Sequence, residues 1–272
     1  MSQNLKLKKA EYIVLIFVML WLSPFAGNTQ IIKQKIPDKL VVLTFDDAVV
    51  SQYKFVAPLL KEHGFGATFF ICEFPPNFSD KSKYMNWQQI KELGEMGFEI
   101  ANHTRTHPAV GGLTENEFIK ELEYIENKCD SFKIEKPLTF AYPGYSISPQ
   151  VVDVLKKKGY CFARAGGSRA YQPGEDNPLL VPSWAMTSDN KTQIMEALEQ
   201  ARGGNIVVLT IHGVPDTEHP WVTTPTELFA EYINYLSENN FKVIALRDLL
   251  KYIDTEKAIT ILQPDFKKPL KN

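Results

Sequence analysis

The sequence is poor in cysteine, and its three cysteines lie far apart. Cys72, Cys129 and Cys161 form no Cys-x-x-Cys pair, the spacing that zinc knuckles and thiol redox motifs require. An odd number of cysteines also limits an exported protein to at most one internal disulfide. We therefore interpret each cysteine as a small buried side chain.

The chain also lacks a strong charge of either sign. Its formal net charge is -2 over 272 residues, so no broad basic field attracts it to a phosphate backbone. Nucleic acid is therefore not an expected partner. A low-complexity linker is missing as well, and 44% hydrophobic residues are enough for one sizeable core. A single folded domain is the simplest expectation.

A long apolar run occurs only near the N-terminus. A lysine-rich start precedes the apolar stretch 12–22, and small residues and helix breakers follow it up to Gly27. This order is typical of a secretory signal, and the stretch is short for a bilayer span. Residues 1–27 are predicted to be a signal peptide or, because no clear cleavage site stands out, a signal anchor. The folded part is then periplasmic, secreted or anchored facing outward, with the membrane as a partner only through this segment.

From residue 39 onward, short apolar runs alternate with amphipathic segments. Strands are expected at 39–45, 66–71, 98–102, 138–143, 160–166, 179–186, 205–212 and 241–246, and helices at 53–64, 86–97, 114–129, 148–159, 190–202 and 224–240. Asn86 is expected to cap its helix, and Thr114 and Glu117 have capping-box spacing. The segment 254–272 lacks helical periodicity and is expected to be an extended or disordered C-terminal tail.

Seven or eight apolar strands that alternate with helices predict a parallel α/β fold. Their number in roughly 230 residues favours a barrel, or a distorted (β/α) barrel of mostly parallel strands, over an open sheet. Periodicity alone leaves the open sheet as an alternative.

The polar groups that could carry chemistry stand at the ends of predicted strands. Asp46 and Asp47 end the first strand, His103 and His107 follow the third, and His212 ends a late one. The carboxyl ends of parallel strands share one edge, where such folds gather functional groups. Each residue alone is more often a turn, cap or surface residue. Together, two imidazoles and one carboxylate are a common protein ligand set for a catalytic Zn²⁺.

Two local conformations are needed for these side chains to converge. The four-residue spacing brings both imidazoles together if residues 103–107 form a single helical turn, which Pro108 then ends. Neighbours on a regular strand point to opposite faces. The adjacent aspartates therefore share one side only where the strand breaks, near Ala48. In that arrangement Asp47 ligates the metal and Asp46 stays free as a general base.

Three ordered motifs resemble those of the NodB-like polysaccharide deacetylases, carbohydrate esterase family 4. Thr-Phe-Asp-Asp stands at 44–47, His-Thr-Arg-Thr-His at 103–107 and Leu-Thr-Ile-His at 209–212. The resemblance covers residues 38–250, which are expected to form the NodB homology domain. It implies a distorted (β/α) barrel and a metal-dependent hydrolase that removes acetyl groups from an N-acetylated, or failing that an O-acetylated, polysaccharide or oligosaccharide.

The resemblance also implies a role for each matching residue. Asp47, His103 and His107 bind a divalent metal, usually zinc, although other divalent transition metals fit the same set. Asp46 is the general base that takes a proton from the metal-bound water as it attacks the acetyl carbonyl. His212 is the general acid that protonates the departing amine or hydroxyl.

Two motifs of the family depart from its usual pattern here. Residues 140–145 read Phe-Ala-Tyr-Pro-Gly-Tyr, without the arginine that usually orients the base aspartate. Arg105 and Arg164 are candidate substitutes. The aspartate that usually helps to hold the acid histidine protonated also has two candidates, Asp189 and Asp216, between which the sequence does not choose.

Flat and small side chains near the strand ends are candidates for contact with a sugar ring. The set is Tyr142, Pro143, Gly144, Tyr145, Trp184 and Trp221. Plain packing is the common alternative for each aromatic residue. His219 is not expected to ligate the metal, because three protein ligands already suffice.

Two other functions are compatible with this scaffold. One is hydrolysis of a non-peptide C–N bond in a small amide, against which the signal segment argues because such enzymes serve intracellular metabolism. The other is a non-catalytic glycan-binding protein, against which the presence of all five site residues argues.

Overall fold

The computed structural model describes residues 31–74 and 77–271, so the predicted signal segment lies outside the described residues. The strands are β1 (Leu40–Asp46), β2 (Thr68–Ile71), β3 (Glu99–Asn102), β4 (Thr139–Ala141), β5 (Phe162–Arg164), β6 (Trp184–Ala185), β7 (Val207–Ile211) and β8 (Lys242–Ile244). The helices are α1 (Ala57–Glu62), α2 (Trp87–Glu95), α3 (Glu115–Ser131), α4 (Pro149–Lys158), α5 (Lys191–Leu198), α6 (Thr226–Glu238) and α7 (Thr255–Ile261). In the described part of the chain, no helix has both the length and the apolar composition that a bilayer span requires.

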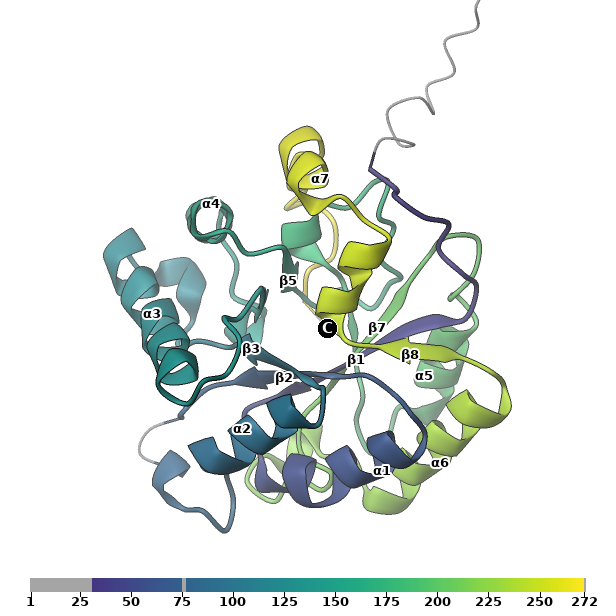
Figure 1. Ribbon diagram of the computed structural model, residues 1–272. Coiled ribbons are helices and arrows are strands. Elements are labelled where there is room, and N and C mark those ends of the chain that lie inside the picture. The colour runs from purple at the N-terminus through teal and green to yellow at the C-terminus, as the bar shows by residue number, and fades with distance from the viewer. Residues whose placement is uncertain (1–30, 75–76, 272) are drawn as a thin grey trace, which may run out of the picture.

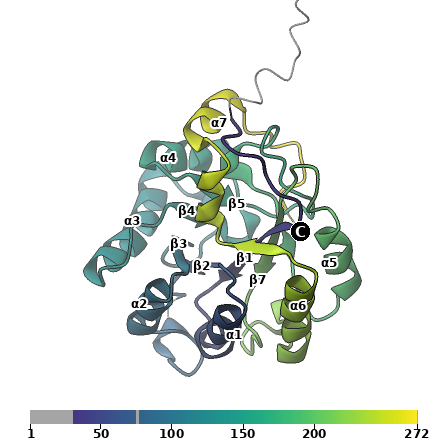
Figure 2. The ribbon, with the colours of Figure 1, turned by 45° about the vertical axis from the view of Figure 1, so that its right-hand side comes forward.

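The eight strands form one parallel sheet that curls into an incomplete barrel (Figure 1). Its order is β5-β4-β3-β2-β1-β7-β6, and β8 pairs with the start of β1. Figure 2 shows helices α1 to α6 around the outside of the strands. Between β5 and β6 the seam is spanned by an isolated parallel bridge, Arg164 to Val181. The predicted distorted (β/α) barrel is confirmed.

Strand β1 is central because its side chains alternate between two apolar cores. Val41, Leu43 and Phe45 pack in the core that includes side chains of α1, α2 and α6, whereas Leu40 and Val42 pack inside the barrel. All seven residues of β1 are buried, as expected for a parallel strand covered on both faces. The strand therefore delivers Asp46, its last residue, to the carboxyl edge of a rigid sheet.

Local signals predicted most helix starts correctly. Asn86 and Thr114 each form a capping box, with Gln89 and Glu117 respectively. The helix expected at 53–64 differs in detail, because a short π-helical segment, Gln52–Val56, precedes α1.

The prediction of an extended or disordered tail from residue 254 is wrong for residues 255–261, whereas residues 262–271 have no helix or strand. Residues 255–261 form α7, which Asp254 caps through the backbone N–H of Lys257. A helix this short has only marginal stability on its own. Here it packs Ala258 into the core inside the barrel, with Leu40 and Val42. The following residues are docked as well, because the N–H of Gly166 donates to the carbonyl oxygen of Leu270 at 3.0 Å.

Candidate active site

Four of the five histidines of the chain line one cavity of about 420 Å³ at the carboxyl ends of the strands. They are His103, His107, His212 and His219, and the two adjacent aspartates line the same cavity. The structure thus brings together all five residues that the motifs predicted.

The two aspartates share the cavity because the backbone turns sharply after β1. Asp47 and Ala48 both have positive φ values, 72° and 54°, in the left-handed region that L-residues seldom occupy. This break ends the alternation of strand side chains. The expected break near Ala48 is therefore present, and both carboxylates are buried in the same place.

The histidine segment is not the helical turn that the spacing predicted. Residues 103–107 follow β3 as an irregular loop in which Thr104 and His107 have φ values of 65° and 55°. Side-chain bonds hold this unusual backbone: Asn102 Oδ1 accepts from the N–H of Thr104 at 2.9 Å, and Thr104 Oγ1 accepts from the N–H of His107 at 3.1 Å. The two imidazole rings still converge, with centroids 4.8 Å apart.

Asp47, His103 and His107 are arranged as a metal centre requires. Asp47 Oδ1 lies 3.5 Å from His103 Nε2 and 3.7 Å from His107 Nε2, and the three candidate ligand atoms lie within 4.8 Å of one another. The carbonyl oxygen of Ala141 lies 2.8 Å from His103 Nδ1, so Nδ1 carries the hydrogen and Nε2 has a free lone pair. That buried Nε2 has no hydrogen-bond partner among the described residues. The donor set and this unpaired atom fit a divalent cation.

The protonation states also suit metal binding. Burial lowers the pKa of His103 to about 4, so its imidazole is neutral near pH 7, the form that ligates metals. Burial acts to raise the pKa of Asp47, but the imidazoles of His212, His107 and His103 outweigh it and the pKa is lowered. Asp47 is therefore ionised.

Cys72 is a neighbour of this centre that the sequence did not single out. Its Sγ lies 3.6 Å from Asp47 Oδ1. Burial, more than any other effect, raises the pKa of this thiol well above its usual value. The protonated thiol donates to the carboxylate and fixes its orientation. Its position directly after β2, at the edge where the other functional residues lie, was the available signal.

Arg164 is the arginine that contacts Asp46. Its Nη2 donates to Asp46 Oδ2 at 2.6 Å, and its Nη1 donates to Thr210 Oγ1 at 2.9 Å. The guanidinium is fully buried and lies 5.4 Å from the ring centroid of Phe70. Arg105 instead stacks on Tyr124 at 4.2 Å. Of the two candidate substitutes, the structure brings only Arg164 to the aspartate.

His212 faces both aspartates but lacks the expected carboxylate behind it. Its Nε2 lies 4.0 Å from Asp46 Oδ2 and 3.8 Å from Asp47 Oδ2. In the described part of the chain, its buried Nδ1 has no hydrogen-bond partner. Asp189 is exposed and accepts from Thr187, whereas Asp216 pairs with His219 at 3.3 Å. Neither candidate aspartate hydrogen-bonds His212.

Gln52 connects the two strand ends that carry Asp46 and His212. Its Nε2 donates to the carbonyl oxygens of both residues, at 3.1 Å for His212. The side chain is buried at the start of the π-helical segment. No sequence pattern pointed to this residue, because its role depends on β1 and β7 being neighbours.

The mouth of the cavity is aromatic. Four of the six residues expected to contact a sugar line it: Tyr142, Gly144, Tyr145 and Trp221. Trp221 is 72% exposed, so its ring is free to stack. Trp184 is only 3% exposed and packs in the core between the sheet and the surrounding helices. Pro143 is also buried. Neither lines the cavity, and Phe74, which the sequence did not single out, does so while stacking on His107 at 5.0 Å.

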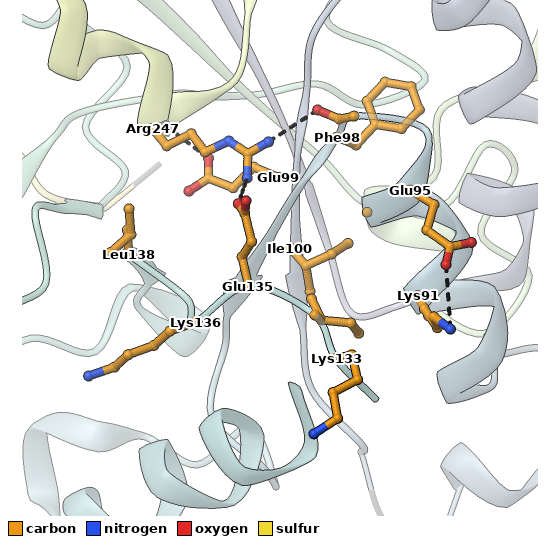
Figure 3. A pocket seen from close by; sticks show the side chains of 13 residues that line it. Lys91, Glu95, Phe98, Glu99, Ile100, Lys133, Glu135, Lys136, Leu138 and Arg247 are labelled. Carbon is orange, nitrogen blue, oxygen red and sulfur yellow. Dashed lines mark hydrogen bonds and ion pairs between the residues drawn. The ribbon is translucent and has the colours of Figure 1, made fainter. Parts of the chain in front are cut away.

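A second cavity, of about 290 Å³, lies at the opposite end of the strands (Figure 3). Two ion pairs line it, Lys91 with Glu95 at 3.4 Å and Arg247 with Glu135 at 2.9 Å. Glu99 lines this cavity, and its carboxylate accepts from Thr68, Thr139 and the backbone N–H of Arg247. These bonds join β3 to its neighbours β2 and β4, so the role of Glu99 is structural.

Fold and site together define a distorted (β/α) barrel with an Asp-His-His constellation at the carboxyl ends of its strands. Residues 33–163 match the family model described as polysaccharide deacetylase. This stretch, slightly under half of the chain, is similar to that family.

Two curated relatives from Bacillus subtilis (strain 168) match parts of the chain. YxkH, which carries a provisional polysaccharide deacetylase name, is 26% identical over 140 residues, 51% of this chain and 49% of YxkH. YlxY, an uncharacterized protein, is 28% identical over 124 residues, 45% of this chain and 37% of YlxY. The matched stretches thus span half or less of each relative.

Solved structures share the fold at low sequence identity. The peptidoglycan N-acetylglucosamine deacetylase Bc1960 has a TM-score of 0.56 at 16% identity, covering 78% of this chain and 88% of its own. PdaA of Bacillus subtilis, a family 4 carbohydrate esterase, has a TM-score of 0.55 at 20% identity, covering 78% and 81%. BA3943 of Bacillus anthracis, a pseudoenzyme of the family, also has a TM-score of 0.55, at 21% identity over 79% and 66%. Because the fold includes a pseudoenzyme, activity has to be argued from the site.

Proposed function

We propose that this protein is an exported, metal-dependent deacetylase of an N-acetylated glycan. The observation that carries the proposal is the complete site: an Asp-His-His set lies beside a second, arginine-held aspartate and a histidine in one cavity. The match of residues 33–163 to the polysaccharide deacetylase family model supports the substrate class. The lysine-rich and apolar start of the sequence supports export.

Asp47, His103 and His107 would hold the cation, and zinc is the metal that this ligand set commonly binds. When bound, the cation supplies a Lewis acid that polarises the acetyl carbonyl and makes a water molecule acidic near neutral pH. The remaining chemistry belongs to side chains of this protein.

Asp46 takes a proton from water. Arg164 donates to its Oδ2 at 2.6 Å, which fixes the orientation of the carboxylate. Its buried Oδ1 has no hydrogen-bond partner among the described residues, so Oδ1 is the atom that accepts the proton. Proton transfer by such a positioned group contributes roughly 10²- to 10⁴-fold to the rate.

The mouth of the cavity supports a sugar substrate. The exposed ring of Trp221 and the ring of Tyr145 both line it, and flat aromatic faces are suited to the apolar face of a pyranose. A cavity of about 420 Å³ accommodates one ring with its acetyl group pointing to the aspartates.

The test is acetate release from chitin oligosaccharides, peptidoglycan fragments, poly-N-acetylglucosamine and acetylxylan, each with and without a chelator. We expect release from at least one N-acetylated glycan and its loss on chelation. The Asp46→Asn variant should keep bound metal and lose about 10²-fold or more of the turnover. Glycan binding without acetate release would favour the non-catalytic alternative, and release from acetylxylan alone would move the substrate to O-acetyl esters.

A further inference from the structure

The base and the acid that the motifs imply stand at the ends of two neighbouring strands. Asp46 is the last residue of β1, and His212 follows β7 directly. The pairing between these two strands ends at Phe45 and Ile211. Asp46 and His212 therefore lie one residue beyond the last pair, where the β1–β7 ladder no longer fixes one backbone relative to the other.

A single side chain joins the two backbones at this level. Gln52 Nε2 donates to the carbonyl oxygen of Asp46 and, at 3.1 Å, to that of His212. An amide NH2 group has two hydrogens, so one group can serve both acceptors. Gln52 is fully buried, which excludes bulk water as a competitor for these bonds. Its amide therefore continues the connection between β1 and β7 past the end of the ladder.

The segment that carries Gln52 is itself held in place. The N–H of Gln52 donates to the carbonyl oxygen of Val49 at 3.0 Å. Ser51 Oγ accepts from the N–H of Val214, in the loop after β7, at 2.8 Å. Gln52 then begins the π-helical segment that leads into α1. The amide thus extends from a fixed backbone, so its two bonds constrain the strand ends.

The other atom of the amide indicates which bonds the side chain serves. Gln52 Oε1 is buried and has no hydrogen-bond partner in the described part of the chain. Buried polar atoms without a partner are uncommon in proteins. An apolar side chain of the same length would fill this space without the cost of an unpaired acceptor. The two donor bonds, to Asp46 and His212, are therefore the feature that explains an amide here.

The imidazole of the acid depends on its backbone for its position. His212 Nε2 lies 4.0 Å from Asp46 Oδ2. Arg164 holds the carboxylate of Asp46, whereas the buried Nδ1 of His212 has no hydrogen-bond partner among the described residues. The backbone of His212, which Gln52 contacts, is thus an important constraint on the ring. A displacement of about 1 Å in an active site can lower the rate by about 10²-fold.

We propose that Gln52 is a positioning residue that sets the separation between Asp46, the base, and His212, the acid. The inference rests on the proposed deacetylase function. Gln52 is not among the described residues that line the cavity, so it acts through the backbones of the two residues that it joins. Its bonds should therefore matter for the proton transfers, and thus for kcat, and hardly for the binding of glycan or cation.

The first experiment compares kcat with KM in the zinc-loaded protein, on the N-acetylated glycan from which the wild type releases acetate. Gln52→Met keeps the length of the side chain and removes both donor hydrogens. We expect kcat to fall by about 10- to 100-fold, with KM and zinc affinity within about twofold of the wild type. Gln88 is an exposed glutamine of α2, and Gln88→Met is the matched control that should change none of these quantities.

A double-mutant cycle separates positioning from general support of the fold. In His212→Asn the acid is already absent, so adding Gln52→Met should cost a smaller factor in kcat than it costs the wild type. A residue that only stabilises the fold would lower turnover by the same factor in both backgrounds. Thermal melts keep every assay well below the Tm of each variant. If Gln52→Met does not fold, Gln52→Asn, which keeps an amide on a shorter side chain, serves for the same two comparisons with a smaller expected loss of kcat.

Four results would overturn the inference. One is an unchanged kcat in the Gln52 variant. A rise in KM or a loss of zinc affinity as large as the loss of kcat would show that Gln52 shapes the binding site instead. Equal factors in the wild-type and His212→Asn backgrounds would reduce its role to support of the fold. A wild type that releases no acetate from any glycan would overturn the deacetylase function, and the positioning role with it.

Discussion

Arg164 shows how a missing residue can be replaced from another strand. The arginine usual for the family's third motif is absent from residues 140–145. Arg164, at the end of β5, places its guanidinium 2.6 Å from Asp46. Both partners are buried, so each compensates the desolvation of the other.

Replacing this arginine tests the pair. Arg164→Met leaves Asp46 as an unpaired buried charge, which should lower the free energy of unfolding by about 3–5 kcal/mol. Denaturant unfolding measures the change, and glycan turnover should fall in parallel. Arg105→Met is the control, because that exposed side chain lies on Tyr124 and its loss should cost about 0.5 kcal/mol or less. Equal stability of the two variants would contradict the assignment.

Cys72 gives a second prediction, on metal affinity. Its thiol donates to Asp47 Oδ1, and losing a group that orients a ligand typically weakens metal binding by about 10- to 100-fold. In a chelator competition, Cys72→Ala should therefore bind zinc about 10-fold more weakly than the wild type. The zinc affinity of Cys72→Ser should remain close to that of the wild type. Cys129→Ala removes a buried thiol that is not part of the site and should leave affinity unchanged. The same zinc affinity in all three variants would rule out an orienting thiol.

At the scale of elements, the sequence predicted what depends on local pattern. Apolar runs located the strands, and polar caps located the starts of α2 and α3. The predicted helical turn at residues 103–107 was wrong. The left-handed residues Thr104 and His107 are held by side-chain hydrogen bonds, which the spacing of the histidines does not reveal. For a related reason, the sequence could not choose between Arg105 and Arg164 as the partner of Asp46. Strands β5 and β1 are not neighbours in the sheet, so this side chain reaches Asp46 across the barrel.

The C-terminal segment is another element that only tertiary contacts explain. Asp176 is buried and accepts from both guanidinium nitrogens of Arg169, at 2.7 and 3.0 Å, and from Lys268 Nζ at 2.8 Å. Near by, a Cβ atom on Gly167 would lie 2.2 Å from the carbonyl oxygen of Pro269. The segment is thus anchored beside the end of β5, which carries Arg164.

This anchor predicts a specific loss of stability in acid. Burial acts to raise the pKa of Asp176, but hydrogen bonds from Arg169 and Lys268 outweigh it and the pKa is lowered from 3.8. The folded state therefore binds this proton more weakly, so Asp176 stabilises it above pH 3.8 and the contribution is lost as the pH falls through the lower, folded pKa. Asp176→Asn should be less stable than the wild type near pH 7, and the gap should narrow below pH 4 in urea unfolding. A gap independent of pH would contradict this.

At the scale of the whole molecule, metal binding should be visible as stability. A ligand that binds only the folded state at 100 times its Kd adds about 2.7 kcal/mol to the free energy of unfolding. For a chain of this size each kcal/mol raises Tm by roughly 2–4 °C. Zinc in that excess should therefore raise Tm by about 5–11 °C, and a chelator should reverse the shift.

The control for this shift is Asp47→Asn, which keeps the size of the side chain and removes the carboxylate ligand. Its Tm should respond far less to zinc in the same thermal melt. If zinc raised the Tm of both proteins equally, the cation would be binding elsewhere.

The seam between β5 and β6 determines whether activity or secondary structure is lost first on unfolding. In the backbone, the bridge from Arg164 to Val181 and the hydrogen bond from the N–H of Ser168 to the carbonyl oxygen of Ser183 span the seam. The side chain of Arg164 spans it again by binding Thr210 on β7 and Asp46 on β1. Arg164 therefore takes part both in closing the barrel and in holding the base. Any partial opening there withdraws the guanidinium from Asp46 while the remaining strands stay paired. Heat or denaturant should accordingly extinguish turnover before the far-ultraviolet circular dichroism of the barrel changes.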